Sequence, residues 1–306
     1  MPAIPDTLIE TRGLTRRFGR ETAVAGIDLM VPAGSVYGFL GPNGAGKTTT
    51  IRMLLGLIRP SAGDVRLFGR PLQGNRLEVL RKVSALVETP SLYPHLSGRE
   101  NLEITRRLLD LPSSAIERAL ALVNLSSAGS KLVRSYSLGM RQRLALALAL
   151  LPEPVLLILD EPTNALDPAG IHEIRGLIAA LPREHGITVF LSSHLLGEVE
   201  QLASHLGIIQ RGSLLFQGTL EELQARRKAH LILGADQPDL ARRILSENGW
   251  QVLPASNGLL HVVAEGPADA ARANRLLVQA GVDVSRLGLE QPSLEETFLS
   301  LTQEKP

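Results

Sequence analysis

The sequence predicts an α/β fold, a parallel sheet covered by helices, followed by a smaller α+β domain. In the first part, short apolar runs alternate with glycine-rich turns and helical patterns, which is typical of such a sheet. After Gly218 the pattern changes to short strands separated by two helices. With 306 residues the chain is long enough for two domains that each bury a core, and we expect them at residues 1–220 and 221–306.

Three short apolar runs are the expected strands of the first domain, at residues 36–40, 155–159 and 188–191. The first run ends in glycines, and the second stops abruptly at two carboxylates. Between these two runs, residues 89–151 have a mostly helical pattern, which predicts a helical insert in the domain.

Two serine–glutamate pairs within this insert have the spacing of a capping box. In a capping box the serine and a glutamate three residues later satisfy free amides at the start of a helix. The pairs are Ser97 with Glu100 and Ser114 with Glu117. We therefore expect a helix to start at each serine.

The second domain is expected to have the order βαββαβ, the split arrangement of a ferredoxin-like fold. The expected strands cover residues 230–233, 250–253, 259–264 and 282–289, and the expected helices cover residues 238–248 and 267–280. A final helix is expected from the capping-box spacing of Ser293 and Glu296. The connector at residues 221–230 carries Arg226, Arg227 and Lys228, which we interpret as a solvated helix face.

The composition excludes several classes of function. The 32 basic and 31 acidic residues give a net charge of +1, so no global field attracts nucleic acid or anionic lipid, and no nucleic-acid partner is expected. The absence of cysteine excludes disulfides, thiolate nucleophiles and cysteine-based zinc sites. The longest apolar run, residues 144–151, is far shorter than the ~20 residues of a membrane span, and residues 1–13 lack the apolar stretch of a signal peptide. We therefore expect a soluble cytoplasmic chain.

A phosphate-binding loop follows the first expected strand. Residues 41–49 read Gly-Pro-Asn-Gly-Ala-Gly-Lys-Thr-Thr and precede a helix expected at residues 49–57. Glycines let backbone N–H groups converge on phosphate oxygens, and a helix N-terminus favours an anion. Lys47, one of only five lysines, is expected to neutralise the β- and γ-phosphates of ATP, and Thr48 to offer its hydroxyl to Mg²⁺. The other expected nucleotide contacts in the loop are Gly41, Asn43, Gly44, Ala45, Gly46 and Thr49.

Two adjacent carboxylates, Asp160 and Glu161, follow the second expected strand, at the edge where open α/β sheets bind ligands. Asp160 is expected to hold Mg²⁺ through water. Glu161 is expected to polarise the water that attacks the γ-phosphate. Because consecutive strand residues point to opposite faces, we expect the two side chains to have different roles.

Residues 136–144 read Tyr-Ser-Leu-Gly-Met-Arg-Gln-Arg-Leu and resemble Leu-Ser-Gly-Gly-Gln, the signature of the nucleotide-binding subunits of ATP-binding cassette (ABC) transporters. The resemblance covers about residues 8–218. It implies an ABC cassette, which is a P-loop NTPase with a RecA-like core, an antiparallel β subdomain and a helical subdomain. Ser137 and Gly139 open an expected helix, whose first N–H groups form an anion site. By resemblance this second anion site holds the ATP of another copy, which implies a homodimer with ATP at the interface.

Further residues are assigned by the same resemblance. Asp167, in Asn-Ala-Leu-Asp, corresponds to the aspartate that couples the two sites across the dimer. His194 corresponds to the histidine near the γ-phosphate, and is expected to act in catalysis with Glu161 and Lys47. Phe18 corresponds to the aromatic residue that stacks on adenine, with core packing as the alternative interpretation.

Two positions depart from the family pattern. Glu88 stands where the family usually has glutamine, and its carboxylate could ligate Mg²⁺ more strongly than an amide while adding negative charge near the γ-phosphate. Met140 replaces the glutamine of the signature and loses the hydrogen bonds of its amide. Both substitutions affect how the site closes and leave the prediction of nucleotide binding unchanged.

Residues 88–102 and 292–302 are similar to bacitracin-resistance and lantibiotic-immunity exporters of the ABC-2 type. This resemblance implies an ATPase that powers export of an antibiotic, peptide or drug-like substrate. A separate integral-membrane permease would dock near residues 88–102, which places the chain at the cytoplasmic face of the cell membrane.

Other functions stay open at this point. A soluble cassette ATPase acting on ribosomes or DNA is one alternative, although this chain has a single cassette and no long coiled-coil or basic insertion. A regulatory ATP-sensing module is another. The second domain fits a dimer brace, a regulatory module, a permease contact or a folded extension without a ligand.

Overall fold

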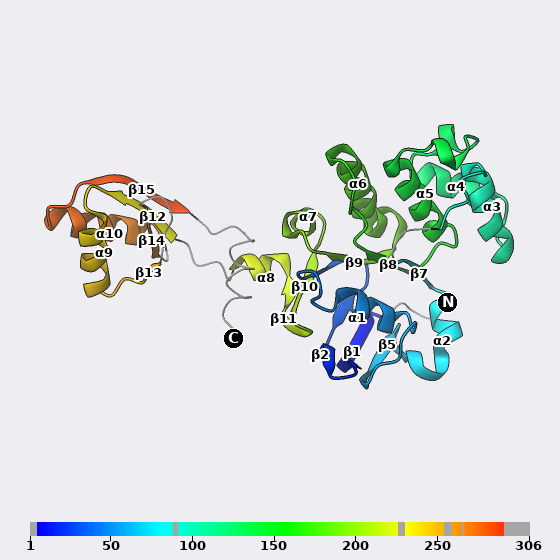
Figure 1. Cartoon of the computed structure of the whole chain (residues 1–306), viewed down its shortest axis with the longest axis horizontal. Helices are drawn as coiled ribbons and strands as arrows, with labels where there is room; N and C mark the ends of the chain where they lie inside the picture. Colours follow the sequence, from blue (N-terminus) through cyan, green and yellow to red (C-terminus); the bar gives the residue numbers. More distant parts are fainter. Residues whose placement is uncertain (1–4, 88–90, 226–229, 254–258, 265, 291–306) are drawn as a thin grey trace. The chain divides into compact units, whose positions relative to one another are not determined.

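A computed structural model describes residues 5–87, 91–225, 230–253, 259–264 and 266–290. By contacts between residues, the chain forms two compact units, Met1–Leu220 and Glu221–Pro306. Figure 1 shows the helices and strands of both units, which are described separately below.

A mainly parallel sheet is the centre of the larger unit. Over the described residues its strand order is β11-β10-β4-β9-β8-β7, and β11 alone runs antiparallel to its neighbour. The strands are β4 Val36–Leu40, β7 Val83–Leu86, β8 Leu156–Asp160, β9 Thr188–Ser193, β10 His205–Gln210 and β11 Ser213–Thr219. The expected strands fall on β4, β8 and β9, whose apolar side chains are buried as in a sheet covered on both faces.

Two of these strands differ from the expected ranges at their ends. Strand β8 begins and ends one residue later than expected, and β9 continues two residues further, through Ser192 and Ser193. Both serines are buried, but because they are polar, a search for apolar runs could not assign them to the strand. Their hydroxyls are hydrogen-bonded, which offsets the free-energy cost of burying a polar group.

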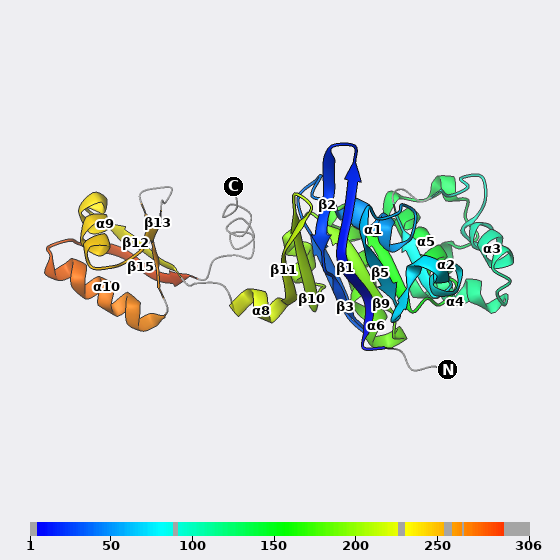
Figure 2. The same ribbon diagram turned by 90° about the horizontal axis from the view of Figure 1, so that it is seen from below.

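A second, antiparallel sheet lies in the same unit (Figure 2). In the part of the chain described, its order is β2-β1-β5-β6, with β3 paired to β1. The strands are β1 Thr7–Phe18, β2 Glu21–Ile27, β3 Met30–Pro32, β5 Ala62–Leu67 and β6 Arg70–Pro71. Phe18 and Glu21 face each other at the end of the β1–β2 hairpin.

One hydrophobic core joins the two sheets around helix α1, Lys47–Leu54. It includes Ile51 of the helix, Leu14 of β1 and Phe190 of β9, each fully buried. The helix begins two residues before the expected start and ends three residues before the expected end. It stops early because the chain turns at Gly56, which has a φ of 63° that favours glycine.

Most of the remaining helices of the larger unit follow β7 in sequence. The elements are α2 Leu72–Leu80, α3 Gly98–Leu108, α4 Ser114–Leu122, η1 Ser126–Ala128, η2 Val133–Ser135, α5 Leu138–Leu150, α6 Pro168–His185 and α7 Leu196–Glu200. Helix α3 has the predicted capping box between Ser97 and Glu100. The second predicted box is wrong, because Ser113 occupies the cap position of α4 and no side chain caps that helix.

The smaller unit has the predicted βαββαβ order. Its described strands are ordered β13-β14-β12-β15, each antiparallel to its neighbour. The elements are α8 Leu220–Ala225, which begins at the boundary, β12 His230–Ala235, α9 Pro238–Glu247, β13 Val252–Leu253, β14 Leu260–Val263, α10 Pro267–Gln279 and β15 Val284–Glu290. Leu245 of α9 and Leu277 of α10 pack with Leu231 and Leu233 of β12 in a separate core.

Some expectations fall on residues that the structure leaves undescribed. The final helix from Ser293 and the basic residues Arg226, Arg227 and Lys228 lie outside the described ranges. Within those ranges, no helix combines the length and the apolar character that crossing a membrane requires.

Candidate functional site

The predicted phosphate-binding loop connects β4 to α1, and two of its glycines allow no side chain. A Cβ atom at Gly41 would lie 2.3 Å from the carbonyl oxygen of Ile209. At Gly46, φ is 107° and a Cβ atom would lie 2.4 Å from the carbonyl oxygen of Ala23. The loop can therefore wrap tightly at these positions only with glycine.

Lys47 is buried beneath this loop, with its side chain 6% exposed. Its Nζ donates hydrogen bonds to the carbonyl oxygens of Gly41 (2.7 Å) and Pro42 (3.3 Å). The ammonium group thus lies under the loop backbone that is predicted to hold phosphates. This position suits a cation whose role is to neutralise phosphate oxygens.

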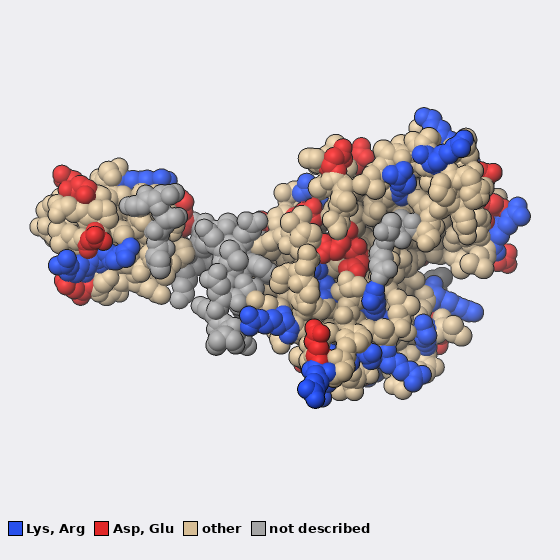
Figure 3. Space-filling view, in the orientation of Figure 1, with Lys and Arg blue, Asp and Glu red and all other residues tan. Residues whose placement is uncertain are grey.

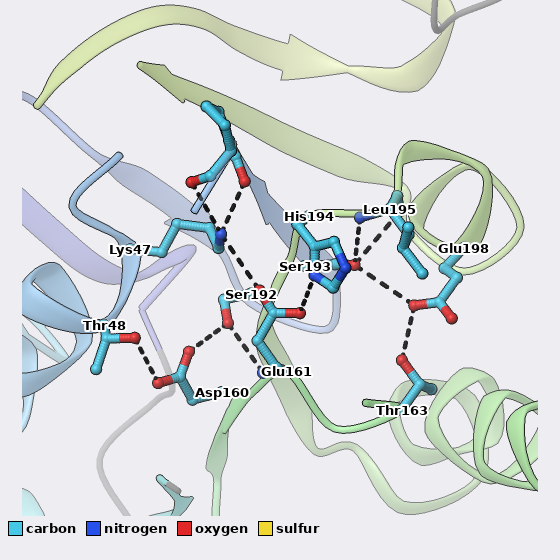
Figure 4. A network of polar contacts seen from close by, with 12 residues as sticks. Lys47, Thr48, Asp160, Glu161, Thr163, Ser192, Ser193, His194, Leu195 and Glu198 are labelled. Atoms are coloured by element: carbon cyan, nitrogen blue, oxygen red, sulfur yellow. Dashed lines mark hydrogen bonds and ion pairs between the residues drawn. The ribbon is translucent and has the colours of Figure 1, made fainter. Parts of the chain in front are cut away.

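Asp160 lies at the end of β8 and accepts two hydroxyl hydrogen bonds. Thr48 Oγ1, from the first turn of α1, donates to Asp160 Oδ2 at 2.8 Å. Ser192 Oγ, from β9, donates to Asp160 Oδ1 at 2.5 Å (Figure 4). The two predicted metal-binding residues in the described chain, Thr48 and Asp160, are therefore in direct contact.

Glu161 bridges the other two residues predicted to act in catalysis. Its Oε1 atom lies 3.2 Å from Lys47 Nζ, and its Oε2 atom lies 2.7 Å from Nδ1 of His194. Figure 4 shows the three side chains together beside the Thr48–Asp160 contact. Lys47, Glu161 and His194 come from three separate segments, so this contact depends on the packing of α1, β8 and β9.

A backbone turn that the sequence did not predict directs the side chains of Asp160 and Glu161 to different contacts. Glu161 has a φ of 50°, in the left-handed region, so the chain leaves the strand at this residue. Its amide donates to Ser192 Oγ at 3.0 Å. The expected division of roles is consistent with the different contacts of the two carboxylates, but it arises from this turn and not from strand alternation.

A pocket of ≈ 560 Å³ contains most of these groups. Lys47, Thr48, Glu161 and His194 line it, together with Phe18, Asn43, Gly44, Gly46 and Thr49. The ring of Phe18 is 47% exposed, and the guanidinium of Arg16 lies 4.5 Å from its centroid. This exposure disfavours the alternative that Phe18 packs in the core.

The signature residues and Asp167 occupy helix starts. Ser137 is the N-cap of α5 and accepts a hydrogen bond from the amide of Met140 at 3.2 Å. Gly139 lies in the same first turn, and the described residues that line the pocket include neither of them. Asp167 is the N-cap of α6 and accepts from the amide of Gly170 at 2.9 Å. Glu88 lies outside the described residues.

Several residues near the site were missed by reasoning from the sequence. Glu21 and Asn164 line the pocket, and Ser192 contacts both Asp160 and the amide of Glu161. The run Leu-Ser-Ser-His at residues 191–194 was a signal for Ser192, because polar residues ending a buried strand face the ligand edge of the sheet. Glu21 could have been found from its place beside Phe18 in a short hairpin turn.

Charge on the visible face of the larger unit is unevenly distributed. Figure 3 shows Asp and Glu side chains gathered near the ends of β8 and β9, whereas Lys and Arg are scattered over other parts of that face. An anionic ligand at the site would therefore be repelled by nearby carboxylates unless cations accompany it.

A phosphate-binding loop between a strand and a helix, with carboxylates at the ends of neighbouring parallel strands, defines a P-loop NTPase. A protein family described as ABC transporter matches residues 24–164. The bacitracin transport ATP-binding protein BcrA of Bacillus licheniformis is 42% identical over 299 residues, covering 96% of this chain and 97% of the relative. The daunorubicin/doxorubicin resistance ATP-binding protein DrrA of Streptomyces peucetius is 38% identical, covering 97% and 93%. The chain belongs to the ABC transporter family.

The likeness extends to solved structures. The structure of cbiO1 from Clostridium perfringens, part of an ABC transporter complex, is similar with a TM-score of 0.67 and 25% identity, covering 79% of this chain and 96% of that one. These findings confirm the predicted fold class, and the chain is an ATPase of the ABC transporter family.

Proposed function

We propose that two copies of this chain bind ATP with Mg²⁺ between them, and that hydrolysis drives export of an antibiotic, peptide or drug-like molecule. The observation that carries this proposal is the single pocket that contains Lys47, Thr48, Glu161 and His194. In it, a cation for phosphate, an oxygen donor for a metal and a carboxylate paired with a histidine lie within contact distance.

The contacts of Lys47 are the first that we expect to change when a triphosphate binds. Its Nζ is shared between two loop carbonyls and Glu161. Phosphate oxygens at the loop compete with Glu161 for this ammonium. Glu161 then accepts a proton from the attacking water, with His194 at Nδ1 keeping the carboxylate oriented. Phe18 stacks on the base of the nucleotide at the open side of the pocket.

The oxygen atoms of Thr48 and Asp160 fit Mg²⁺. Magnesium prefers oxygen ligands and is usually held by one or two carboxylates together with substrate phosphates. Among the described residues, no group of three or more His, Asp or Glu side chains is placed to hold a metal ion. When bound, the ion neutralises charge on the phosphates beside the nearby carboxylates. Glu88 is a further proposed ligand.

The signature helix supplies the second half of each ATP site. Ser137 and Gly139 lie at the start of α5, where N–H groups favour an anion. Since these residues do not share the pocket of Lys47 within the described chain, we assign them to the ATP bound by the partner copy. Asp167, exposed at the start of α6, is the proposed link between the two sites.

Residues 1–220 form the proposed ATP-binding domain and residues 221–306 an accessory domain.

The proposed cargo class follows the relatives, which are named for transport of bacitracin and resistance to daunorubicin. The permease is proposed to dock near residues 88–102, which would hold the chain at the cytoplasmic face of the membrane. Capture of a multi-span membrane protein with the full chain from detergent extracts tests this partner.

The dimer is tested with Glu161→Gln, which removes the proposed base and leaves the phosphate-binding loop intact. Static light scattering with saturating ATP and Mg²⁺ should show the mass rising from 33.0 kDa toward twice that value. The control Glu184→Gln, at the exposed end of α6, should hydrolyse ATP and return to the mass seen without nucleotide. A Glu161→Gln protein that stays monomeric in ATP would contradict the proposal.

A further inference from the structure

Three consecutive residues after β8 are each held by a side chain from a different element. The contacts are Glu161 N to Ser192 Oγ of β9 (3.0 Å), Gln142 Nε2 of α5 to Pro162 O (2.9 Å), and Thr163 Oγ1 to Glu198 Oε2 of α7 (2.7 Å). The segment is thus fixed through its amide, its carbonyl and a side-chain hydroxyl in turn.

The chain from Glu161 to Ala165, which includes these three residues, needs such support because its backbone is strained. Glu161 has a φ of 50° and Ala165 a φ of 63°, both in the left-handed region that disfavours residues with a Cβ atom. Conformations of this kind persist where the surrounding structure over-determines them. The position of the Glu161 carboxylate therefore depends on the residues that hold the segment.

Glu198 also contacts the segment that carries His194, to which Ser192 itself belongs. Its Oε2 atom lies 3.4 Å from Ser193 Oγ, and Ser193 Oγ accepts the amide of Leu195 at 3.0 Å (Figure 4). Ser193 and Leu195 flank His194 in the sequence. One carboxylate oxygen thus contacts hydroxyls from both segments.

The two partners of Glu198 are buried, and Glu198 itself is partly buried. Thr163 is 7% exposed and Ser193 is 2% exposed. Hydrogen bonds to an ionised acceptor are stronger than those between neutral groups, and burial limits their exchange with water. The geometry is therefore suited to holding the two segments at a fixed separation.

We propose that Glu198 is a positioning residue for ATP hydrolysis. By joining Thr163 to Ser193, it supports the contact between Glu161 and His194, whose side chains meet at 2.7 Å, in addition to the direct contact of Ser192 Oγ with the Glu161 amide. Glu198 acts through these residues and does not itself touch the phosphates. The inference rests on the proposed roles of Glu161 and His194.

The test compares Glu198→Ala and Glu198→Gln in the full chain, with Glu184→Gln as the matched control. Glu198→Ala is expected to lower kcat about 10- to 100-fold, because misplacing reacting groups by about an ångström costs rates of this order. The KM for ATP is expected to change less than about twofold, since the binding residues are untouched. Glu198→Gln keeps an acceptor oxygen and should give an intermediate kcat, and the control should match the parent chain.

Thr163 provides a second pair of variants in case Glu198→Ala folds poorly. Thr163→Val removes the hydroxyl and should lower kcat as Glu198→Ala does, whereas Thr163→Ser keeps the hydroxyl and should restore it. The double variant Thr163→Val with Glu198→Ala should be no slower than the slower single variant. An unchanged kcat in Thr163→Val, or a loss explained by a lower melting temperature with normal kcat per folded site, would overturn the proposal.

Failure of this inference can be told apart from failure of the proposed function. If Glu161→Gln and His194→Ala hydrolyse ATP at the parental rate, the proposed roles of both residues are refuted. If both are inactive while the Glu198 and Thr163 variants keep the parental kcat, only the positioning role of Glu198 is refuted.

Discussion

Glu161 Oε1 lies 3.2 Å from Nζ of Lys47, so the carboxylate proposed to activate water is paired with the ammonium proposed to bind phosphate. Both side chains are largely shielded, with 22% and 6% of their surfaces exposed. An ion pair in such a place is screened less by salt than a surface pair. ATP and Glu161 therefore compete for the same cation.

The first prediction follows from this competition. Glu161→Gln should slow hydrolysis by a factor of roughly 10² to 10⁴, the usual contribution of a general base. The same change should tighten ATP binding, because the substituted amide no longer competes for Lys47. Phosphate release and equilibrium binding of ATP measure the two effects. Weaker ATP binding by Glu161→Gln would show that the pair does not oppose the nucleotide.

The second prediction concerns the exposed ring of Phe18. Phe18→Ala should weaken ATP binding by about 1–3 kcal/mol, the range for stacking of a base on an aromatic side chain. Binding of tripolyphosphate, which has no base, should be unchanged in the same variant. Calorimetric titration of both ligands into Phe18→Ala and Phe18→Tyr makes the comparison, and equal losses for the two ligands would exclude stacking as the cause.

The third prediction concerns Glu88, where the family usually has glutamine. We expect Glu88→Gln to change the Mg²⁺ dependence of hydrolysis more than the affinity for ATP, because the substitution replaces a carboxylate with a neutral amide, a weaker ligand for Mg²⁺, and leaves the phosphate-binding loop intact. Titrations of the ATPase rate with Mg²⁺ for both proteins test this. Superimposable titrations would argue against direct ligation by Glu88.

The fourth prediction is a pH dependence in helix α3. Hydrogen bonds from Arg106 and then Arg107 lower the pKa of Glu103 to about 2. The carboxylate therefore stabilises the folded chain fully above its unfolded pKa of about 4.3, and this contribution is lost as the pH falls toward 2. The melting temperature of Glu103→Gln should lie below that of the parent near neutral pH, and the difference should narrow steadily below about pH 4. A difference that stays constant with pH would contradict this origin.

Local sequence patterns predicted the fold and the phosphate loop well, because each depends on neighbours in the chain. Residues 36–40 form β4 at the expected positions, and Ser97 caps α3 through a glutamate three residues away. The order βαββαβ of the smaller unit likewise follows from alternating local patterns. Strand ends were harder to predict, since the buried hydroxyl of Ser192 is explained by its partners Asp160 and the amide of Glu161, which are distant in sequence.

The arrangement of the candidate site depended more on tertiary packing. The motifs placed Lys47, Asp160, Glu161 and His194 near one another, yet they gave no sign that the Glu161 carboxylate bridges Lys47 and His194. The left-handed turn at Glu161 could not be predicted either, because glutamate has no preference for that conformation. Thr163 and Glu198 were missed because their contact joins the segment after β8 to helix α7, 35 residues away in the sequence.

The backbone at Glu161 also has a consequence for how this chain tolerates change. Glycine or asparagine would adopt its φ of 50° more readily than glutamate does. Glutamate is therefore unfavourable for the backbone at this position, and its proposed role in hydrolysis accounts for its presence. Glu161→Gly should therefore relieve backbone strain of roughly 1 kcal/mol, but it would also remove hydrolysis and leave the buried ammonium of Lys47 without its carboxylate partner. Residue 161 is thus a point where the local preference of the backbone and the tertiary contacts of the side chain act in opposite directions.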